Sequence, residues 1–269
     1  MSGFSAEWLA LREPHDLRAR NHAVLDAVAS YLETRSGVRV VDLASGTGST
    51  LRALSGRLPS PQNWTLIDND PDLLAHAVAS PLDENVTADT VPLDLNFALE
   101  AALDRDVDLV AMSALLDLVS STWLDRLAVN VATRGTPLYA ALSYDGRIGF
   151  VPADPFDTAI AAAVNMHQLG DKGFGPALGP AAAAFAVARV EALGYSVKQG
   201  ASDWVIGPED KDMQTELLAG WANAVRATGA IPLAETAAWL ARRSKDIAAG
   251  QSSLRVGHVD FFAVPSTTR

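Results

Sequence analysis

A turn of small residues between an apolar strand and a helix is the feature that most constrains how this chain folds. The predicted strand is Val38-Arg39-Val40-Val41-Asp42-Leu43, and the turn is Ala44-Ser45-Gly46-Thr47-Gly48-Ser49. A helix is predicted to follow over about 49–58. Glycine permits the tight backbone turns that join a parallel strand to the helix after it. A unit of this kind predicts a sheet whose strands alternate with helices along the chain.

The rest of the chain continues this alternation. Six further strands are predicted, at about 63–68, 86–91, 107–112 and 136–142, from 195, and at 254–264. Helices are predicted at about 16–35, from 71, and at 97–104, 122–133, 180–193, 210–228 and 233–248. Seven strands interleaved with helices predict an α/β fold, with a seven-stranded, mostly parallel, doubly wound sheet and helices on both faces.

No internal repeat, low-complexity tract or long linker divides the chain, so a single domain over residues 1–269 is expected. Residues 1–36 form an N-terminal helical segment, and residues 37–142 carry the strand and turn units. Residues 143–179 and 208–250 exceed what a minimal sheet needs. Each stretch follows a strand expected to run parallel, so each emerges at the carboxyl edge, where open α/β sheets bind ligands. We expect these stretches to be helical cap insertions on the substrate side; the alternative is that they pack elsewhere.

The charge of the chain argues against nucleic acid as a partner. Its 32 acidic and 21 basic residues give a formal net charge of −11, and the basic residues are scattered apart from Arg242-Arg243 with nearby Lys245. A nucleic-acid binder usually carries a basic stripe that neutralises phosphates. We therefore expect a small molecule as the substrate. The sequence predicts no oligomeric state.

Composition disfavours two other classes of protein. With no cysteine, the chain has no disulfide, no thiolate nucleophile and no cysteine-ligated metal centre. The longest nearly apolar run, Ala181 to Ala188, is far shorter than the roughly 20 residues that cross a bilayer. The first residues lack the basic and apolar regions of a secretory signal. We expect no membrane span and a cytoplasmic protein.

An acid follows the glycine turn at the spacing of a nucleoside site. Asp68 stands at the end of the second predicted strand, about 20 residues after Gly48, where a carboxylate can accept hydrogen bonds from ribose hydroxyls. A dinucleotide fingerprint needs a third glycine, but Leu51 or Ser49 holds that position, and no Gly-Lys-Ser/Thr closes a phosphate loop. An adenosine ligand without a phosphate cradle points to S-adenosylmethionine. A solvated loop around Asp68 is the alternative.

Four segments resemble the motifs of class I S-adenosylmethionine-dependent methyltransferases. Val41 to Gly48 is similar to the first motif of this family, with Ala44 where the family usually has glycine. Leu66 to Leu74 resembles the second motif, and the third and fourth are matched by Pro92 to Leu95 and Asp108 to Asp117. The opening stretch Trp8 to Arg20 is similar to the start of a bacterial subgroup, so the resemblance covers about residues 8–142. The family's sheet has seven strands with the last antiparallel, in agreement with the strands predicted above.

The resemblance implies S-adenosylmethionine as the cofactor and makes residues 37–142 the cofactor-binding half. It implies that Asp68 accepts hydrogen bonds from the ribose, that Asp94 contacts the adenine amino group and that Leu95 lies near the ring. Asp94 can equally be a surface acid before the next helix. Arg20 can pair with the methionyl carboxylate through a fork-shaped contact, or form a surface ion pair. The expected cofactor-binding residues are Arg20, Asp42, Ala44, Ser45, Gly46, Gly48, Asp68, Asn69, Asp94, Leu95 and Ser113.

Methyl transfer from a sulfonium demands alignment of the acceptor and exclusion of water, with no obligatory catalytic residue. A general base would help if the acceptor is a hydroxyl or an ammonium group, and histidine suits neutral pH. His167, in a proposed cap segment, and Asp145, just after the fifth strand, are the candidate catalytic residues. Ordinary loop positions explain them as well. No histidine and acid cluster has the spacing of a metal site, so no metal is expected.

The sequence thus predicts methyl transfer from S-adenosylmethionine to the oxygen or nitrogen of a small molecule. One alternative is an NAD(P)-dependent oxidoreductase on a similar Rossmann sheet, against which the missing third glycine counts. The other is a non-catalytic protein that keeps the fold of a methyltransferase and binds its cofactor.

Overall fold

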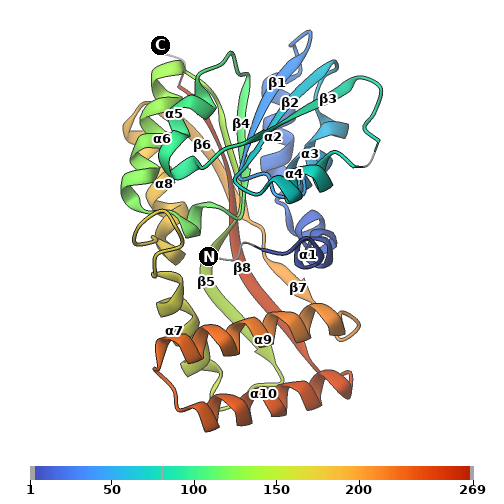
Figure 1. Ribbon diagram of the computed structural model, residues 1–269, viewed down its shortest axis with the longest axis vertical. Helices are drawn as coiled ribbons and strands as arrows, with labels where there is room; N and C mark the ends of the chain where they lie inside the picture. The colour runs from blue at the N-terminus through green and yellow to red at the C-terminus, as the bar shows by residue number, and fades with distance from the viewer. Residues whose placement is uncertain (1–3, 80, 267–269) are drawn as a thin grey trace.

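The structure, a computed structural model, describes residues 4–79 and 81–266. Within those residues, eight strands form one sheet in the order β3-β2-β1-β4-β5-β8-β6, with β7 paired to β8 (Figure 1). β1 to β5 run parallel, whereas β8 runs antiparallel to β5, β6 and β7. The predicted α/β fold and mostly parallel sheet are confirmed, and β7 is an addition. The strands are β1 (Val38–Leu43), β2 (Gln62–Asp68), β3 (Val86–Pro92), β4 (Leu109–Ser113), β5 (Leu138–Val151), β6 (Tyr195–Ala201), β7 (Trp204–Ile206) and β8 (Ser253–Pro265).

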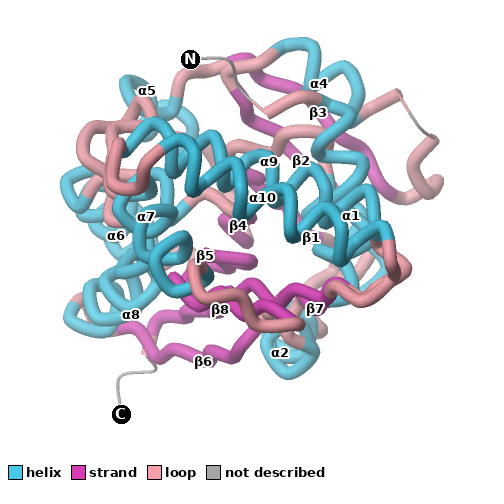
Figure 2. Tube along the Cα trace, turned by 90° about the horizontal axis from the view of Figure 1, so that it is seen from below, coloured by secondary structure: helices cyan, strands magenta, loops and turns pink. Residues whose placement is uncertain are grey.

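Helices cover both faces of the sheet, with α5, α6 and α8 on one face and α2, α3 and α4 on the other (Figures 1 and 2). Successive residues of a strand point to opposite faces, so Val41 belongs to the core under α5, α6 and α8 while Val40 belongs to the other core. The helices are α1 (Ala6–Ala19), α2 (His22–Leu32), α3 (Ser49–Leu54), α4 (Pro71–Ala77), α5 (Leu95–Leu103), α6 (Ser121–Arg134), α7 (Asp157–Gln168), α8 (Ala182–Ala192), α9 (Lys211–Thr228) and α10 (Leu233–Ala248).

The opening helix differs from the prediction of one helix over 16–35. The structure has α1 from Ala6 and a separate α2, with a break at Arg20, whose φ of −51° and ψ of 135° are extended. Asn21 causes the restart because its side chain accepts a hydrogen bond from the Val24 N–H, at 3.1 Å, as an N-cap. α1 therefore ends where α2 begins, and the two helices take different directions.

The fifth strand is longer than the predicted 136–142. β5 continues to Val151 and pairs with β8 as far as Ser253, with register shifts on either side of Ser143 and Tyr144. Leu142 at the first shift has a φ of 54°, and its N–H donates to Asp260 Oδ1 at 2.7 Å, which holds the strained backbone. The segment expected as a loop after the fifth strand is therefore part of the sheet.

A third hydrophobic core lies beyond the carboxyl end of the main sheet. The extended parts of β5 and β8 carry α7, α9 and α10 there, below the sheet in Figure 1. Its largest fully buried side chain is Trp239 of α10, and Trp221 of α9 and Tyr144 of β5 pack into the same core. The stretches 143–179 and 208–250 thus share one helical lobe. No helix in the described parts of the chain has the length and apolarity to cross a membrane.

Candidate functional site

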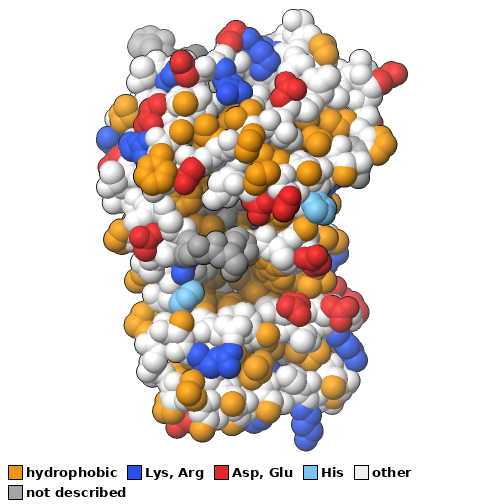
Figure 3. Space-filling model, viewed as in Figure 1, with side chains coloured by type: hydrophobic (Ala, Val, Ile, Leu, Met, Phe, Trp, Pro, Cys, Tyr) orange, Lys and Arg blue, Asp and Glu red, His pale blue; other side chains and the backbone are white. Residues whose placement is uncertain are grey.

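A cavity of about 1070 Å³ lies between the carboxyl ends of β1 to β4 and the helical lobe. The space-filling view shows the molecule hollowed at this level, with acidic and apolar side chains around the hollow (Figure 3). Volumes of roughly 300–1,000 Å³ are usual for small-molecule sites, so this cavity is at the upper end of that range. Its wall is built from α1, from the loops after β1, β2, β3 and β4, and from the loop after α7.

The glycine turn after β1 forms one part of the wall. Ala44 and Gly46 have φ values of 53° and 51°, in the left-handed region. A Cβ on Gly46 would lie 3.2 Å from Leu9 Cδ1 of α1, closer than nearly all real contacts, so the glycine lets α1 lie directly over the turn. The Ser45 N–H donates to the Ile67 carbonyl of the adjacent strand at 2.9 Å. The sequence of the turn therefore fixes both the turn and the helix above it.

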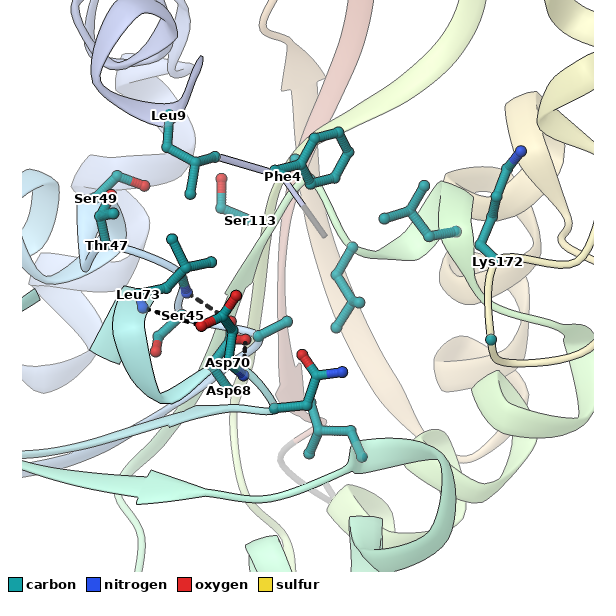
Figure 4. A pocket seen from close by; sticks show the side chains of 18 of the residues that line it. Phe4, Leu9, Ser45, Thr47, Ser49, Asp68, Asp70, Leu73, Ser113 and Lys172 are labelled. Carbon is teal, nitrogen blue, oxygen red and sulfur yellow. Dashed lines mark hydrogen bonds between the residues drawn. The ribbon is translucent and has the colours of Figure 1, made fainter. Parts of the chain in front are cut away.

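Asp68 links the turn to the end of β2. Its Oδ2 accepts from the Gly46 N–H at 2.8 Å and its Oδ1 from the Asp70 N–H at 3.0 Å, as the dashed lines in Figure 4 mark. Burial raises the pKa of the Asp68 carboxyl, and the hydrogen bonds from backbone N–H groups oppose that shift. Each carboxylate oxygen keeps acceptor capacity beyond these bonds, and the side chain lines the cavity.

Six other residues from the predicted cofactor set lie on the same wall. Asp94 is an exposed acid directly before α5, as the alternative for it has it, and caps this helix by accepting the Asn96 N–H on Oδ1 at 2.8 Å; it also lines the cavity. Leu95 is held in place because its carbonyl accepts Trp123 Nε1–H at 2.8 Å. The six are Ala44, Ser45, Asn69, Asp94, Leu95 and Ser113. Gly46 and Asp68, described above, line the cavity as well.

Arg20, Asp42 and Gly48 lie behind the wall. Arg20 is only 2% exposed, and its guanidinium donates to Tyr139 Oη at 3.1 Å and to Ser113 Oγ at 3.4 Å. Asp42 is fully buried, and neither of its carboxylate oxygens has a hydrogen-bond partner among the described residues. Burial raises the pKa of Asp42 to about 8, although the charge of Arg20 opposes the shift. Two environments were expected for Arg20, a surface ion pair or the wall of the cofactor site. Arg20 lies in neither of them.

The two candidate catalytic residues do not themselves line the cavity, although His167 contacts Lys172, which does. His167 is partly buried at the end of α7, and Lys172 Nζ lies 3.4 Å from its Nδ1. Burial and the charge of Lys172 lower the pKa of His167. Asp145 lies on β5 and accepts Arg147 Nε–H at 2.7 Å, while the same guanidinium reaches Asp203. Neither His167 nor Asp145 is among the residues that line the cavity.

Part of the wall comes from α1, most of which precedes residue 16, where the opening helix was predicted to begin. Arg12 pairs with Asp16 through two hydrogen bonds of 2.9 and 3.3 Å, and Asp16 also accepts Trp204 Nε1–H at 2.9 Å. The Arg12 guanidinium lies over the Trp204 ring, 5.0 Å from its centroid. Ser5, whose Oγ accepts the Trp8 N–H at 3.2 Å, is the sequence signal that could have placed the start of α1.

The loop after α7 closes the side of the cavity opposite the glycine turn. Asp171, Lys172, Gly173 and Phe174 line it. The Phe174 ring packs edge-on against Trp123, with centroids 5.6 Å apart. Among the described residues, no group of three or more histidine, aspartate and glutamate side chains is arranged to hold a metal ion.

Comparison with known proteins adds information on the fold. No family profile and no curated protein sequence matches this chain. A cyclopropane-fatty-acyl-phospholipid synthase-like protein from Lactobacillus casei has a similar structure, with a TM-score of 0.55 and 15% identity over 97% of this chain and 95% of that one. The cyclopropane synthase MmaA2 from Mycobacterium tuberculosis has a TM-score of 0.52 and 11% identity over 97% and 94% of the two chains.

A S-adenosylmethionine-dependent methyltransferase from Geobacter sulfurreducens, solved with S-adenosylhomocysteine, gives a TM-score of 0.47 and 16% identity over 99% of this chain and 100% of that one. At sequence identities this low, a structural similarity shows the fold alone. Together with the strand order and the antiparallel β8, the two similarities with TM-scores above 0.5 show that this chain has the fold of the class I methyltransferases.

Proposed function

We propose that this protein binds S-adenosylmethionine in the cavity at the carboxyl end of the sheet and transfers its methyl group to the oxygen or nitrogen of a small molecule. The observation that carries the proposal is the position of Asp68. It stands at the end of β2, accepts a hydrogen bond from the backbone of the glycine turn, and lines a cavity of about 1070 Å³.

The donor and acceptor groups of the wall fit a nucleoside without phosphates. Asp68 would accept from the ribose hydroxyls, and the second carboxylate oxygen of Asp94 would accept from the adenine amino group. Leu73, Leu93 and Leu95 provide apolar surface beside these acids. An acid at the end of β2 suits the ribose of either cofactor, whereas the missing third glycine of the turn, where Leu51 or Ser49 stands, favours a phosphate-free cofactor over NAD(P).

The bound cofactor would supply a methyl group already activated on a sulfonium. The protein's part is to align the acceptor with that group and to exclude water. α1 lies over the glycine turn, and the loop after α7 faces the turn across the cavity (Figure 4), so both elements are placed to enclose the reacting groups.

The helical lobe would act as the substrate-side cap. Its direct contribution to the wall is the loop after α7, whereas α9 supports α1 through Asp210, whose Oδ1 lies 3.8 Å from His15 Nε2. Neither His167 nor Asp145 is among the residues that line the cavity. Their roles as a general base remain predictions.

The test is a transfer assay with S-adenosylmethionine labelled in its methyl group and a library of small hydroxyl and amine compounds. The proposal predicts label in an extracted product together with an equal amount of S-adenosylhomocysteine. Cofactor binding without turnover on any compound would favour the non-catalytic alternative. Label on protein or nucleic acid alone would contradict the small-molecule assignment.

A further inference from the structure

The cavity has two sides of different chemistry. Ser45 and Asp68 belong to the side of the glycine turn, and Lys172 stands across the cavity from them (Figure 4). Apart from Lys172 and the acids of the loops after the strands, Asp68, Asp70 and Asp94, the charged side chains that line the cavity are Arg12 and Asp16 of α1 and Asp171 of the loop after α7. If the turn side holds the cofactor, Lys172 and these three side chains set the charge that an acceptor meets.

Two of these four charges, those of Arg12 and Asp16, neutralise each other within the protein. Arg12 is neutralised by its two hydrogen bonds to Asp16, and the carboxylate of Asp16 also accepts from Trp204. Asp171 Oδ1 accepts the N–H groups of Gly173 and Gly175, at 2.7 and 3.1 Å. Asp16 is therefore neutralised by Arg12, whereas Asp171 keeps its charge at an exposed position and uses Oδ1 to close its own loop.

Lys172 is the cation that remains after Arg12 is paired with Asp16. Its Nζ donates to the His167 carbonyl at 3.0 Å and lies 3.4 Å from His167 Nδ1, and no carboxylate pairs with it in the described part of the chain. An ammonium group has three N–H donors, so at least one remains for a ligand. Burial lowers the pKa of Lys172, and the buried carboxyl of Asp117 opposes that shift from a longer distance.

The loop that carries Lys172 is held in one conformation. The bonds from Gly173 and Gly175 to Asp171 close its turn, with φ values of 104° and 81° at the two glycines. Phe174 packs on Trp123, and the Leu178 N–H donates to the Val119 carbonyl at 2.9 Å. A cation on such a loop is positioned before a ligand arrives, which favours binding because little freedom is lost.

We propose that Lys172 binds an oxyanion of the methyl acceptor, a carboxylate or a phosphate group, while Phe174 packs against an apolar part of the same molecule. The inference rests on the proposed function, since it identifies the second molecule of that cavity. The competing explanation is that Lys172 only caps the last carbonyls of α7, as cations often do at the C-terminal end of a helix.

The experiment uses the full chain saturated with S-adenosylhomocysteine and titrates it with benzoate, phenyl phosphate and benzyl alcohol. We expect one or both oxyanions to bind at least about tenfold more tightly than benzyl alcohol, the scale of one charge-assisted hydrogen bond. The preferred oxyanion distinguishes a carboxylate from a phosphate acceptor. Lys172→Met should abolish the preference and Lys172→Arg should keep it, while Lys198→Met, at an exposed site on β6, should match the wild type.

Three results would overturn the proposal. The first is a wild type with no preference for either oxyanion, and the second is a Lys172→Met variant that keeps the preference. The third is a Lys172→Met variant with a lower melting temperature but an unchanged affinity for benzoate and phenyl phosphate. That third result would show that Lys172 only caps the helix. In each case S-adenosylhomocysteine would still bind, so the proposed function would stand. A protein that does not bind S-adenosylhomocysteine contradicts the proposed function itself.

Discussion

At the scale of single residues, burial raises the pKa of both Asp68 and Asp42, two acids near one turn, but the two differ in the backbone hydrogen bonds that they accept. Asp68 receives two backbone N–H bonds at the cavity, whereas Asp42 has none and is enclosed by the sheet. Backbone donors favour an ionised carboxylate, and burial without donors favours the neutral acid. The first acid is therefore suited to accept hydrogen bonds from a ligand, and the second is suited to stay protonated.

Replacing Asp68 tests its role in the cavity. Asp68→Ala should weaken S-adenosylmethionine binding by at least roughly tenfold, because a charged acceptor for the ribose hydroxyls is lost. Asp72→Ala, at an exposed acid on α4, is the matched control and should bind as the wild type does. Calorimetric titration measures both. An unchanged affinity in Asp68→Ala would remove this residue from the cofactor site.

Asp42 predicts a dependence of stability on pH. Its pKa of about 8 in the folded state lies above the value of an unfolded aspartate, so the folded protein holds the extra proton between these two values. The wild type should therefore lose stability as pH rises through this range, by up to about 1.4 kcal/mol per pH unit. Asp42→Asn stays neutral and escapes this loss.

Urea unfolding of wild type and Asp42→Asn checks the prediction. The variant should gain stability relative to the wild type between about pH 5 and about pH 8. A stability difference that stays constant over this range would mean that Asp42 is ionised in the folded protein.

At the scale of elements, the contact of α1 with the glycine turn depends on a missing side chain. Gly46 has a φ of 51°, and its added Cβ would approach Leu9 Cδ1 to 3.2 Å. Gly46→Ala should lower the free energy of unfolding by about 1–2 kcal/mol, the cost of a left-handed backbone for an L-residue. Displacement of α1 should also weaken cofactor binding.

Gly56→Ala is the control for this change, because nothing lies within 4 Å of its added Cβ. It should leave stability unchanged within about 0.5 kcal/mol or raise it slightly. Thermal unfolding of both variants measures the difference. Equal melting temperatures of the two variants would show that α1 can move away from the turn without a loss of stability.

Local patterns predicted the strand and turn units because their signals lie within a few residues of one another. The glycines after β1, the apolar run of β4 and Asp68 at the end of β2 are examples. The length of β5 was missed because it is set by pairing with β8, as between Val151 and Ser253, about a hundred residues apart in the chain. The wall residues Arg12 and Lys172 were missed for the same reason, since distant segments bring them to the cavity.

At the scale of the whole molecule, the helical lobe depends on a core separate from the two beside the sheet. Trp239 is fully buried in it and donates its Nε1–H to Asp157 Oδ1 at 3.0 Å. Trp239→Ala should lower the free energy of unfolding by about 3–5 kcal/mol, because it leaves a large cavity and an unpaired acceptor.

Leu233→Ala on the same helix is the control, since Leu233 is 66% exposed and should change stability by no more than about 0.5 kcal/mol. Urea unfolding compares the two variants. A small loss for Trp239→Ala would indicate that the lobe adds little to the stability of the whole.

The function proposed for the whole molecule depends on which cofactor enters the cavity. Calorimetric titration of the purified protein with S-adenosylmethionine, S-adenosylhomocysteine and NADH, in parallel, tests this most directly. We predict micromolar binding of the two sulfur compounds and none of NADH. Binding of NADH alone would contradict the proposed methyl transfer and would indicate an oxidoreductase.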